Sequence, residues 1–162
     1  MFWGAASTAF SMAVMQVAIL ANGPPFLAHA AMAWYLLAWL GLMWVFLVSR
    51  LDALNPAERA STAVHFGAKF GCIAILAVEL AIHDGSPVYA LPSFLALVGL
   101  ASFSHGIFYW GRLYLSGVAL FLATAAMALI PMAWWPAWYG AWLTMLQFVM
   151  GIHLRRIHRN RP

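Results

Sequence analysis

The third long apolar stretch of the sequence, from Thr62 to Ile82, contains two full charges, Lys69 and Glu79. A charge at the bilayer centre costs roughly 2.5–3.5 kcal/mol on insertion scales, so such side chains normally face a partner or a polar cavity and indicate a functional site. At about 100° per residue, the polar side chains of this predicted helix gather on one side. This polar face comprises His65, Lys69, Cys72, Glu79 and His83.

Lys69 and Glu79 lie too far apart to neutralise each other. They are about 15 Å apart along a helix that rises ~1.5 Å per residue, so each charge needs its own partner. For Lys69 we expect Ser102, Ser104 or a lipid phosphate, and for Glu79 we expect His83 or a tyrosine such as Tyr89. The polar face is therefore predicted to be shielded by protein.

The opposite side of the same helix carries small residues, and this packing face comprises Ala63, Gly67, Gly71 and Ala74. Gly67 and Gly71 form a G-x-x-x-G pair, which lets the backbone of a neighbouring helix approach closely. The sequence therefore predicts contact with other membrane protein subunits or self-association through this face.

The histidines support three alternative sites. His65 and His105, on the third and fourth predicted helices, are candidate axial ligands of one haem b in a redox subunit. His29, Glu79 and His83 together have the residue types of a two-histidine, one-carboxylate metal site. Glu79 alone is the candidate residue of a small proton or ion conductor.

Catalytic signatures are absent from the sequence. It contains no G-x-S-x-G, no H-E-x-x-H and no phosphate-binding glycine loop. Cys72 is predicted to lie in the middle of the membrane, where a thiol stays protonated and unreactive. We therefore expect a protein that is not an enzyme and holds no cofactor, unless the haem alternative applies.

The composition indicates an integral membrane protein. Of the 162 residues, 65% are hydrophobic and only 7% are charged, which is too apolar for a water-soluble domain of this size. The net charge of +4 depends on a basic C-terminus, predicted to contact lipid headgroups rather than nucleic acid. These basic residues are Arg155, Arg156, Arg159 and Arg161.

Apolar stretches separated by turn signals predict an all-α bundle of about six transmembrane helices, forming a single domain over residues 1–162. The third helix is predicted to begin outside the bilayer at Pro56, and Gly85 is predicted to take a left-handed conformation after it. The expected spans are Phe2–Ala21, Phe26–Ser49, Thr62–Ile82, Pro87–Tyr109, Leu113–Ile130 and Ala137–Leu154.

The distribution of charges predicts the orientation. If both termini are cytoplasmic, Arg50, Arg59 and Arg112 lie on the cytoplasmic side together with the basic C-terminus. The outer loops then contain no Lys or Arg, as the positive-inside rule requires. We therefore expect a multi-pass protein of the bacterial cytoplasmic membrane.

A series of short elements follows Arg50: Asn55-Pro56-Ala57-Glu58-Arg59, Glu79, Val88-Tyr89-Ala90-Leu91-Pro92, Gly111, Tyr114, Leu120-Phe121, Met127-Ala128, Pro131, Tyr139-Gly140, Phe148 and Gly151. This series resembles the C-terminal membrane region of receptor-like serine/threonine protein kinases of planctomycete-type bacteria. The resemblance implies a multi-helix anchor or sensor that follows a cytoplasmic kinase domain. The sequence itself has no glycine-rich ATP loop, no H-R-D and no D-F-G, so no catalytic residue is carried over.

These observations together predict a non-catalytic anchoring or accessory subunit, or a sensory membrane module, packed against partner membrane proteins. The sequence leaves open which partner or signal it serves, its oligomeric state, and whether it is a stand-alone relative or a fragment of a kinase-like protein.

Overall fold

The computed structural model describes residues 2–50, 56–82, 85–108 and 113–159, and all regular structure within these ranges is helical. The helical expectation is therefore confirmed. The six α-helices are α1 (Phe2–Leu20), α2 (Pro25–Arg50), α3 (Pro56–Ile82), α4 (Leu91–Phe108), α5 (Leu113–Met127) and α6 (Trp135–Arg159). Two short 3-10 helices precede α4 and α6, namely η2 (Pro87–Ala90) and η3 (Met132–Trp134).

Two helix starts differ from the predicted ones, and proline explains both differences. The fourth helix was expected from Pro87, and the chain is helical from there, but its first turn is the 3-10 helix η2 and α4 begins at Leu91. The sixth helix was expected from Ala137, but α6 already begins at Trp135. Proline fits the first turn of a helix, where its missing N–H would have no intrahelical acceptor.

Other boundaries agree with the predictions. α3 begins at Pro56, and Gly85 adopts a left-handed backbone with φ of 81° shortly after α3 ends. The turn after α1 contains a second residue with positive φ, Asn22 at 49°. Asparagine tolerates this region better than other residues with a Cβ, so the turn follows directly from the local sequence.

Four helices are long and apolar enough to cross a bilayer, and they contain the segments Trp3–Leu20, Pro25–Val45, Thr62–Ile82 and Pro87–Gly106. α5 is apolar but has only 15 residues, whereas a bilayer core needs about 20. It ends at Met127, before the predicted Ile130, because irregular chain leads from there into η3. Among the described residues, four of the six expected helices thus combine spanning length with sufficient hydropathy, and α6, although 25 residues long, is not one of them.

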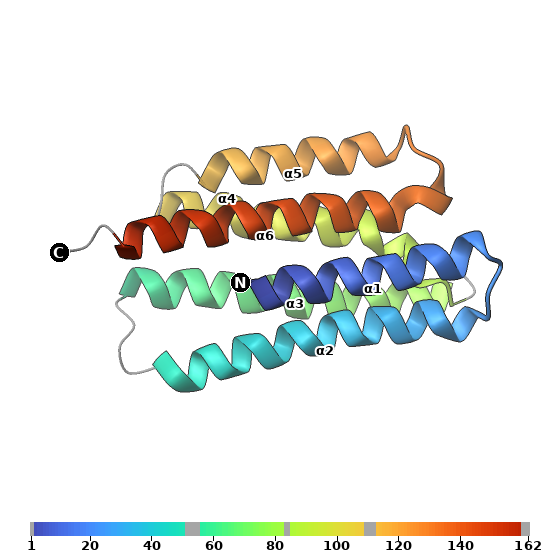
Figure 1. The fold of residues 1–162 in the computed structure, drawn as a ribbon, viewed down its shortest axis with the longest axis horizontal. Coiled ribbons are helices and arrows are strands. Elements are labelled where there is room, and N and C mark those ends of the chain that lie inside the picture. Colours follow the sequence, from blue (N-terminus) through green and yellow to red (C-terminus); the bar gives the residue numbers. More distant parts are fainter. Residues whose placement is uncertain (1, 51–55, 83–84, 109–112, 160–162) are drawn as a thin grey trace.

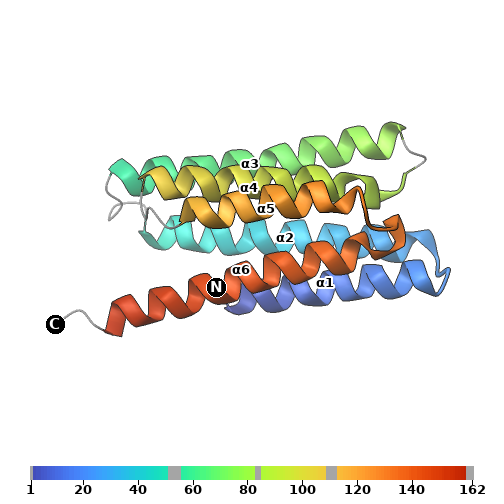
Figure 2. The ribbon, with the colours of Figure 1, turned by 90° about the horizontal axis from the view of Figure 1, so that it is seen from above.

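The six helices run alternately up and down and form a ring in sequence order, as the two views together show (Figures 1 and 2). Contacts around the ring are uneven. α1 packs extensively against α2 and α6, and α4 packs extensively against α3 and α5, whereas α2–α3 and α5–α6 contacts are sparse. We therefore distinguish an α1–α2–α6 group and an α3–α4–α5 group.

The centre of the ring is filled by large buried side chains from α1, α2, α4, α5 and α6, to which α3 adds Cys72. Among them are Met12 and Met15 of α1, Phe94 and Leu95 of α4, and Leu120 of α5. This core joins the two groups, and three polar side chains meet inside it.

Candidate functional site

Lys69 of α3 lies in the core of the bundle, where it contacts two aromatic residues of α2. Its ammonium group donates a hydrogen bond of 3.3 Å to the Tyr35 hydroxyl. The same nitrogen lies 5.3 Å from the centre of the Tyr35 ring and 4.7 Å from the Trp39 ring. Both distances are within the range of a cation–π interaction. The expected partners of Lys69, Ser102 and Ser104 or a lipid phosphate, are therefore wrong.

A third helix joins this cluster through Tyr139 of α6. The Tyr35 and Tyr139 hydroxyls lie 2.8 Å apart, and their rings meet edge to face at 84° with centroids 5.9 Å apart. Lys69, Tyr35, Trp39 and Tyr139 form what we call the membrane-core cluster. It connects the α3–α4–α5 group with both α2 and α6.

Beside this cluster, Thr8 of α1 is the meeting point of three helices. Its hydroxyl donates to the Gly4 carbonyl at 2.9 Å and accepts from the Trp39 indole at 3.2 Å and the Gln147 amide at 3.3 Å. Trp39 thus belongs to both networks, with its ring against Lys69 and its N–H on Thr8. The Trp39 ring is therefore held in place by Thr8 of α1, which is itself hydrogen-bonded to Gln147 of α6.

The sequence analysis did not single out Tyr35, Trp39, Tyr139 or Thr8, because each is one of many aromatic or hydroxyl side chains in the apolar spans. A buried tyrosine usually finds a hydrogen-bond partner for its hydroxyl. Tyr35 lies ten residues into α2, well inside the span, and that depth was the available signal. Nothing in the sequence indicates that Tyr139 of α6 would be the hydrogen-bond partner of Tyr35.

His65 of α3 and His105 of α4 lie in direct contact. Their Nδ1 atoms are 3.2 Å apart, and the rings meet edge to face with centroids 4.3 Å apart. The His105 Nδ1 also lies 3.1 Å from the Ala101 carbonyl, which can only accept. We therefore assign the proton to His105 Nδ1 and an acceptor role to His65 Nδ1.

This geometry bears on the haem alternative for His65 and His105. Axial ligands coordinate iron from opposite faces of the macrocycle. The two rings here touch each other, so haem binding between them requires them to move apart.

The candidate metal site is divided between described and undescribed residues. His83 lies outside the described residues, and no group of three His, Cys, Asp or Glu suited to a metal ion occurs within them. Both ring nitrogens of His29 contact backbone carbonyl oxygens instead. Nδ1 lies 2.8 Å from the Pro25 oxygen, and Nε2 contacts the Gly85 oxygen. It therefore links the start of α2 to the segment after α3.

The remaining members of the predicted polar face have different environments. Cys72 is buried in the core, whereas Glu79 is only partly buried. Cys72 is shielded from solvent by the packed core, so it is poorly placed to act as a nucleophile. The basic C-terminus cannot be assigned contacts, because the side chains of Arg155, Arg156 and Arg159 and the whole of Arg161 lie outside the description.

One residue of the predicted packing face of α3 packs within the chain, and the other three are exposed. A Cβ on Gly71 would lie 3.1 Å from the Leu97 side chain of α4, so this glycine permits close packing within the chain. A Cβ on Gly67 would meet no atom within 4 Å, and Ala63 and Ala74 are exposed. Most of this small-residue face therefore points away from the rest of the protein.

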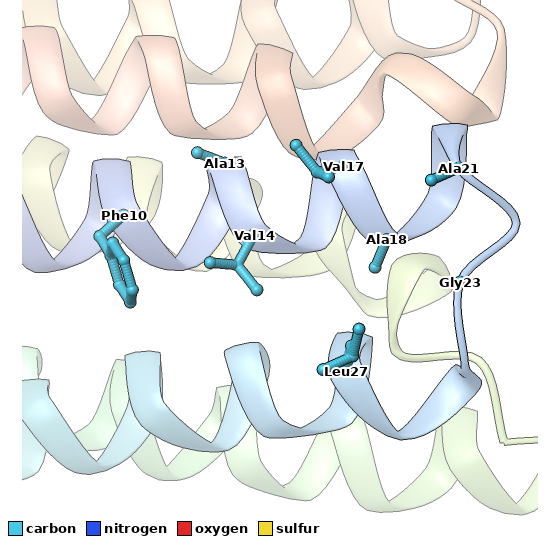
Figure 3. Close-up of a pocket in the computed structure, with 8 residues that line it drawn as sticks. All are labelled: Phe10, Ala13, Val14, Val17, Ala18, Ala21, Gly23 and Leu27. Atoms are coloured by element: carbon cyan, nitrogen blue, oxygen red, sulfur yellow. The ribbon is translucent and has the colours of Figure 1, made fainter.

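An open groove of about 360 Å³ lies between α1 and the start of α2 (Figure 3). It is lined by Phe10, Ala13, Val14, Val17, Ala18, Ala21, Gly23 and Leu27. Figure 3 shows Phe10 and Val14 from one wall and Leu27 from the other, with no polar side chain among the labelled residues. A ligand there would be fixed by shape alone, because specific orientation needs polar groups.

The chemistry available in the core is hydrogen bonding and charge stabilisation. The membrane-core cluster combines one ammonium group with two hydroxyls and contains no carboxylate or activated nucleophile.

No family model, curated protein or solved structure matches this chain, so its likeness to the membrane region of receptor-like kinases stays a prediction from the sequence.

Proposed function

We propose that this chain is a non-catalytic membrane module of anchoring, accessory or sensory type. It packs against another membrane protein, or against a second copy of itself, through the exposed part of the small-residue face of α3. In this proposal all six helices lie in the bacterial cytoplasmic membrane with both termini on the cytoplasmic side. The distribution of arginines supports that orientation.

One observation carries this proposal, namely the poor coverage of α3 by its own chain. Only 11% of its apolar span is buried, compared with 28% for α2 and 50% for the span that contains α4. Helices associate in lipid through small residues that allow close backbone approach, and Gly67 offers that surface with open space before it. The opposite side of α3 is already used, because Lys69 is buried and donates a hydrogen bond to Tyr35 of α2.

A pair of matched glycine substitutions tests the proposal. Gly67→Leu and Gly41→Leu both place a side chain where the folded chain has no atom within 4 Å, so neither disturbs the bundle itself. Gly41 lies on α2, away from the proposed surface. We expect Gly67→Leu to weaken association at least tenfold and Gly41→Leu to leave it unchanged.

Association is measured in two ways. Energy transfer between differently labelled copies in liposomes detects self-association, and native mass spectrometry after extraction from native membranes in mild detergent detects other subunits. If the wild-type chain is a monomer in both measurements, or if the two variants associate equally well, the proposed surface is incorrect.

A further inference from the structure

The membrane-core cluster contains more hydrogen-bond donors than acceptors. A protonated lysine has three N–H donors, and each tyrosine hydroxyl has one O–H donor. Lys69 donates one N–H to Tyr35, and its other contacts are the faces of two aromatic rings. Among the described residues, Tyr139 has only the Tyr35 hydroxyl as a hydrogen-bond partner. Whichever tyrosine donates in that bond, one hydroxyl hydrogen remains without an acceptor.

These donors are shielded from water. Lys69 is 5% exposed, and Tyr35 and Tyr139 are both 0% exposed. Each of these polar atoms has at least one hydrogen-bond partner, but donors left over in a buried site normally find a further acceptor as well. The excess of donors is therefore a property of an enclosed site rather than of a solvated surface.

The cluster also has an excess of positive charge. The contacts of Lys69 in the described part of the chain are a hydroxyl and two ring faces, none of which is a full negative charge. Among the described side chains of α3, the carboxylate is that of Glu79, which lies about 15 Å further along the axis. Cation–π contacts offset part of the cost of burying an ammonium group, but a buried charge is normally paired with an opposite one.

We propose that Lys69, Tyr35 and Tyr139 bind a small monovalent anion of the halide type. Such an ion supplies the missing negative charge and accepts hydrogen bonds from several directions at once. The burial of Lys69 separates it from lipid headgroups and from carboxylates of a partner chain, which leaves a small free ion as the ligand. This inference goes beyond the proposed function, because the anion site lies inside the bundle and the partner surface lies outside it.

Halide dependence of stability tests this site. The equilibrium between folded and unfolded protein is measured by denaturant titration in detergent, with chloride or bromide replaced by gluconate at constant ionic strength. A ligand that binds only the folded state raises the folding equilibrium constant about 11-fold at ten times its dissociation constant. We expect the wild-type chain to show this rise.

Two variants and one control assign the effect to the cluster. Lys69→Met removes the charge but keeps an unbranched side chain, so the halide dependence should disappear. Tyr139→Phe removes one donor and keeps the ring, so it should weaken halide dependence in a variant that keeps the lysine. Arg59→Met removes an exposed cation from the same helix and should leave halide dependence unchanged.

Crystals soaked in bromide provide a second readout, because bromide scatters anomalously. We expect an anomalous peak within hydrogen-bond distance of the Lys69 ammonium group. Equal stability in halide and gluconate overturns the proposal, as does a halide effect that persists undiminished in Tyr139→Phe. A neutral Lys69 amine observed by nitrogen NMR in the presence of chloride would also overturn it.

Discussion

The α1–α2–α6 group and the α3–α4–α5 group join their helices in different ways. In the first group, side-chain hydrogen bonds run from helix to helix. Thr8 accepts from Trp39 and Gln147, and the Tyr35 and Tyr139 hydroxyls pair across α2 and α6. A third connection is formed by Gln16, which is bound to the segment that begins α6.

In the second group, α4 and α5 are in close contact through their backbones. A Cβ on Gly117 of α5 would lie 2.6 Å from the Phe103 amide nitrogen and 2.8 Å from the Gly99 carbonyl oxygen of α4. The first group also has a close glycine, Gly140, but its nearest neighbours are atoms of the Met12 side chain. The backbones of α4 and α5 therefore approach each other closely because Gly117 has no side chain.

This difference shows two solutions to one problem. Lipid is as apolar as leucine, so membrane helices gain little hydrophobic stabilisation from associating and depend on close packing and interhelical hydrogen bonds. One group relies mainly on hydrogen bonds and the other on close packing. Substitutions in the two groups should therefore differ in their effect, and four predictions test this from the largest effect to the smallest.

The largest effect is expected from Gly117→Leu in the α4–α5 contact. The new side chain meets backbone atoms, which cannot move aside as a flexible side chain does, so α4 and α5 must separate. Overpacking of this kind costs about 3 kcal/mol in the free energy of unfolding. Denaturant titration in detergent measures that cost, and Gly41→Leu is the control that meets open space. Equal stability of the two variants would contradict the packing account.

Thr8→Val should destabilise the hydrogen-bonded group by about 2 kcal/mol, because it leaves the Trp39 and Gln147 donors without their shared acceptor. The matched control is Thr124→Val in α5. The Thr124 hydroxyl donates only to the Leu120 carbonyl of its own helix at 2.8 Å, so its removal should cost about 0.5 kcal/mol or less. Unfolding titrations of both variants check the difference, and a larger loss for Thr124→Val would reverse the comparison.

Gln16→Leu should lower the free energy of unfolding by about 1 kcal/mol, because Gln16 of α1 caps the start of α6, which is far away in sequence but adjacent in the fold. Its side-chain oxygen accepts from the Ala137 amide at 3.0 Å, and its nitrogen donates to the Ala133 carbonyl at 2.7 Å. Hydrogen exchange at the Ala137 amide should accelerate in the variant while exchange in α4 stays unchanged. Unaltered protection of Ala137 would show that the cap is dispensable.

The smallest effect is expected from Trp138→Phe at the sparse boundary between the two groups. The Trp138 indole of α6 donates to the Ala123 carbonyl of α5 at 2.9 Å. Phenylalanine keeps an aromatic ring against Trp142 and removes this bond, which is worth about 0.6 kcal/mol in a membrane protein. The unfolding titration used for Gly117→Leu measures the loss. A loss above 2 kcal/mol would show that the boundary is stronger than its sparse contacts indicate.

The sequence predicted much of the fold because helix formation in lipid is decided locally. Apolar length, proline and glycine placed all six helices and the left-handed Gly85. The same reasoning did not foresee that the helix from Pro87 opens with the 3-10 turn η2, or that α6 begins at Trp135 rather than Ala137. It also expected six spanning segments, whereas four helices combine sufficient length and hydropathy among the described residues, and α5, with 15 residues, is too short.

For the candidate site, the sequence identified Lys69 as the residue to explain but did not identify what surrounds it. A charge in an apolar span needs a polar or charged partner, and that requirement can be read from one helix alone. Which residues act as partners of Lys69 depends on how α2, α3 and α6 are rotated and placed in the ring. Tyr35 and Tyr139 are 104 residues apart in sequence and only 2.8 Å apart at their hydroxyls, and this contact exists only through tertiary packing.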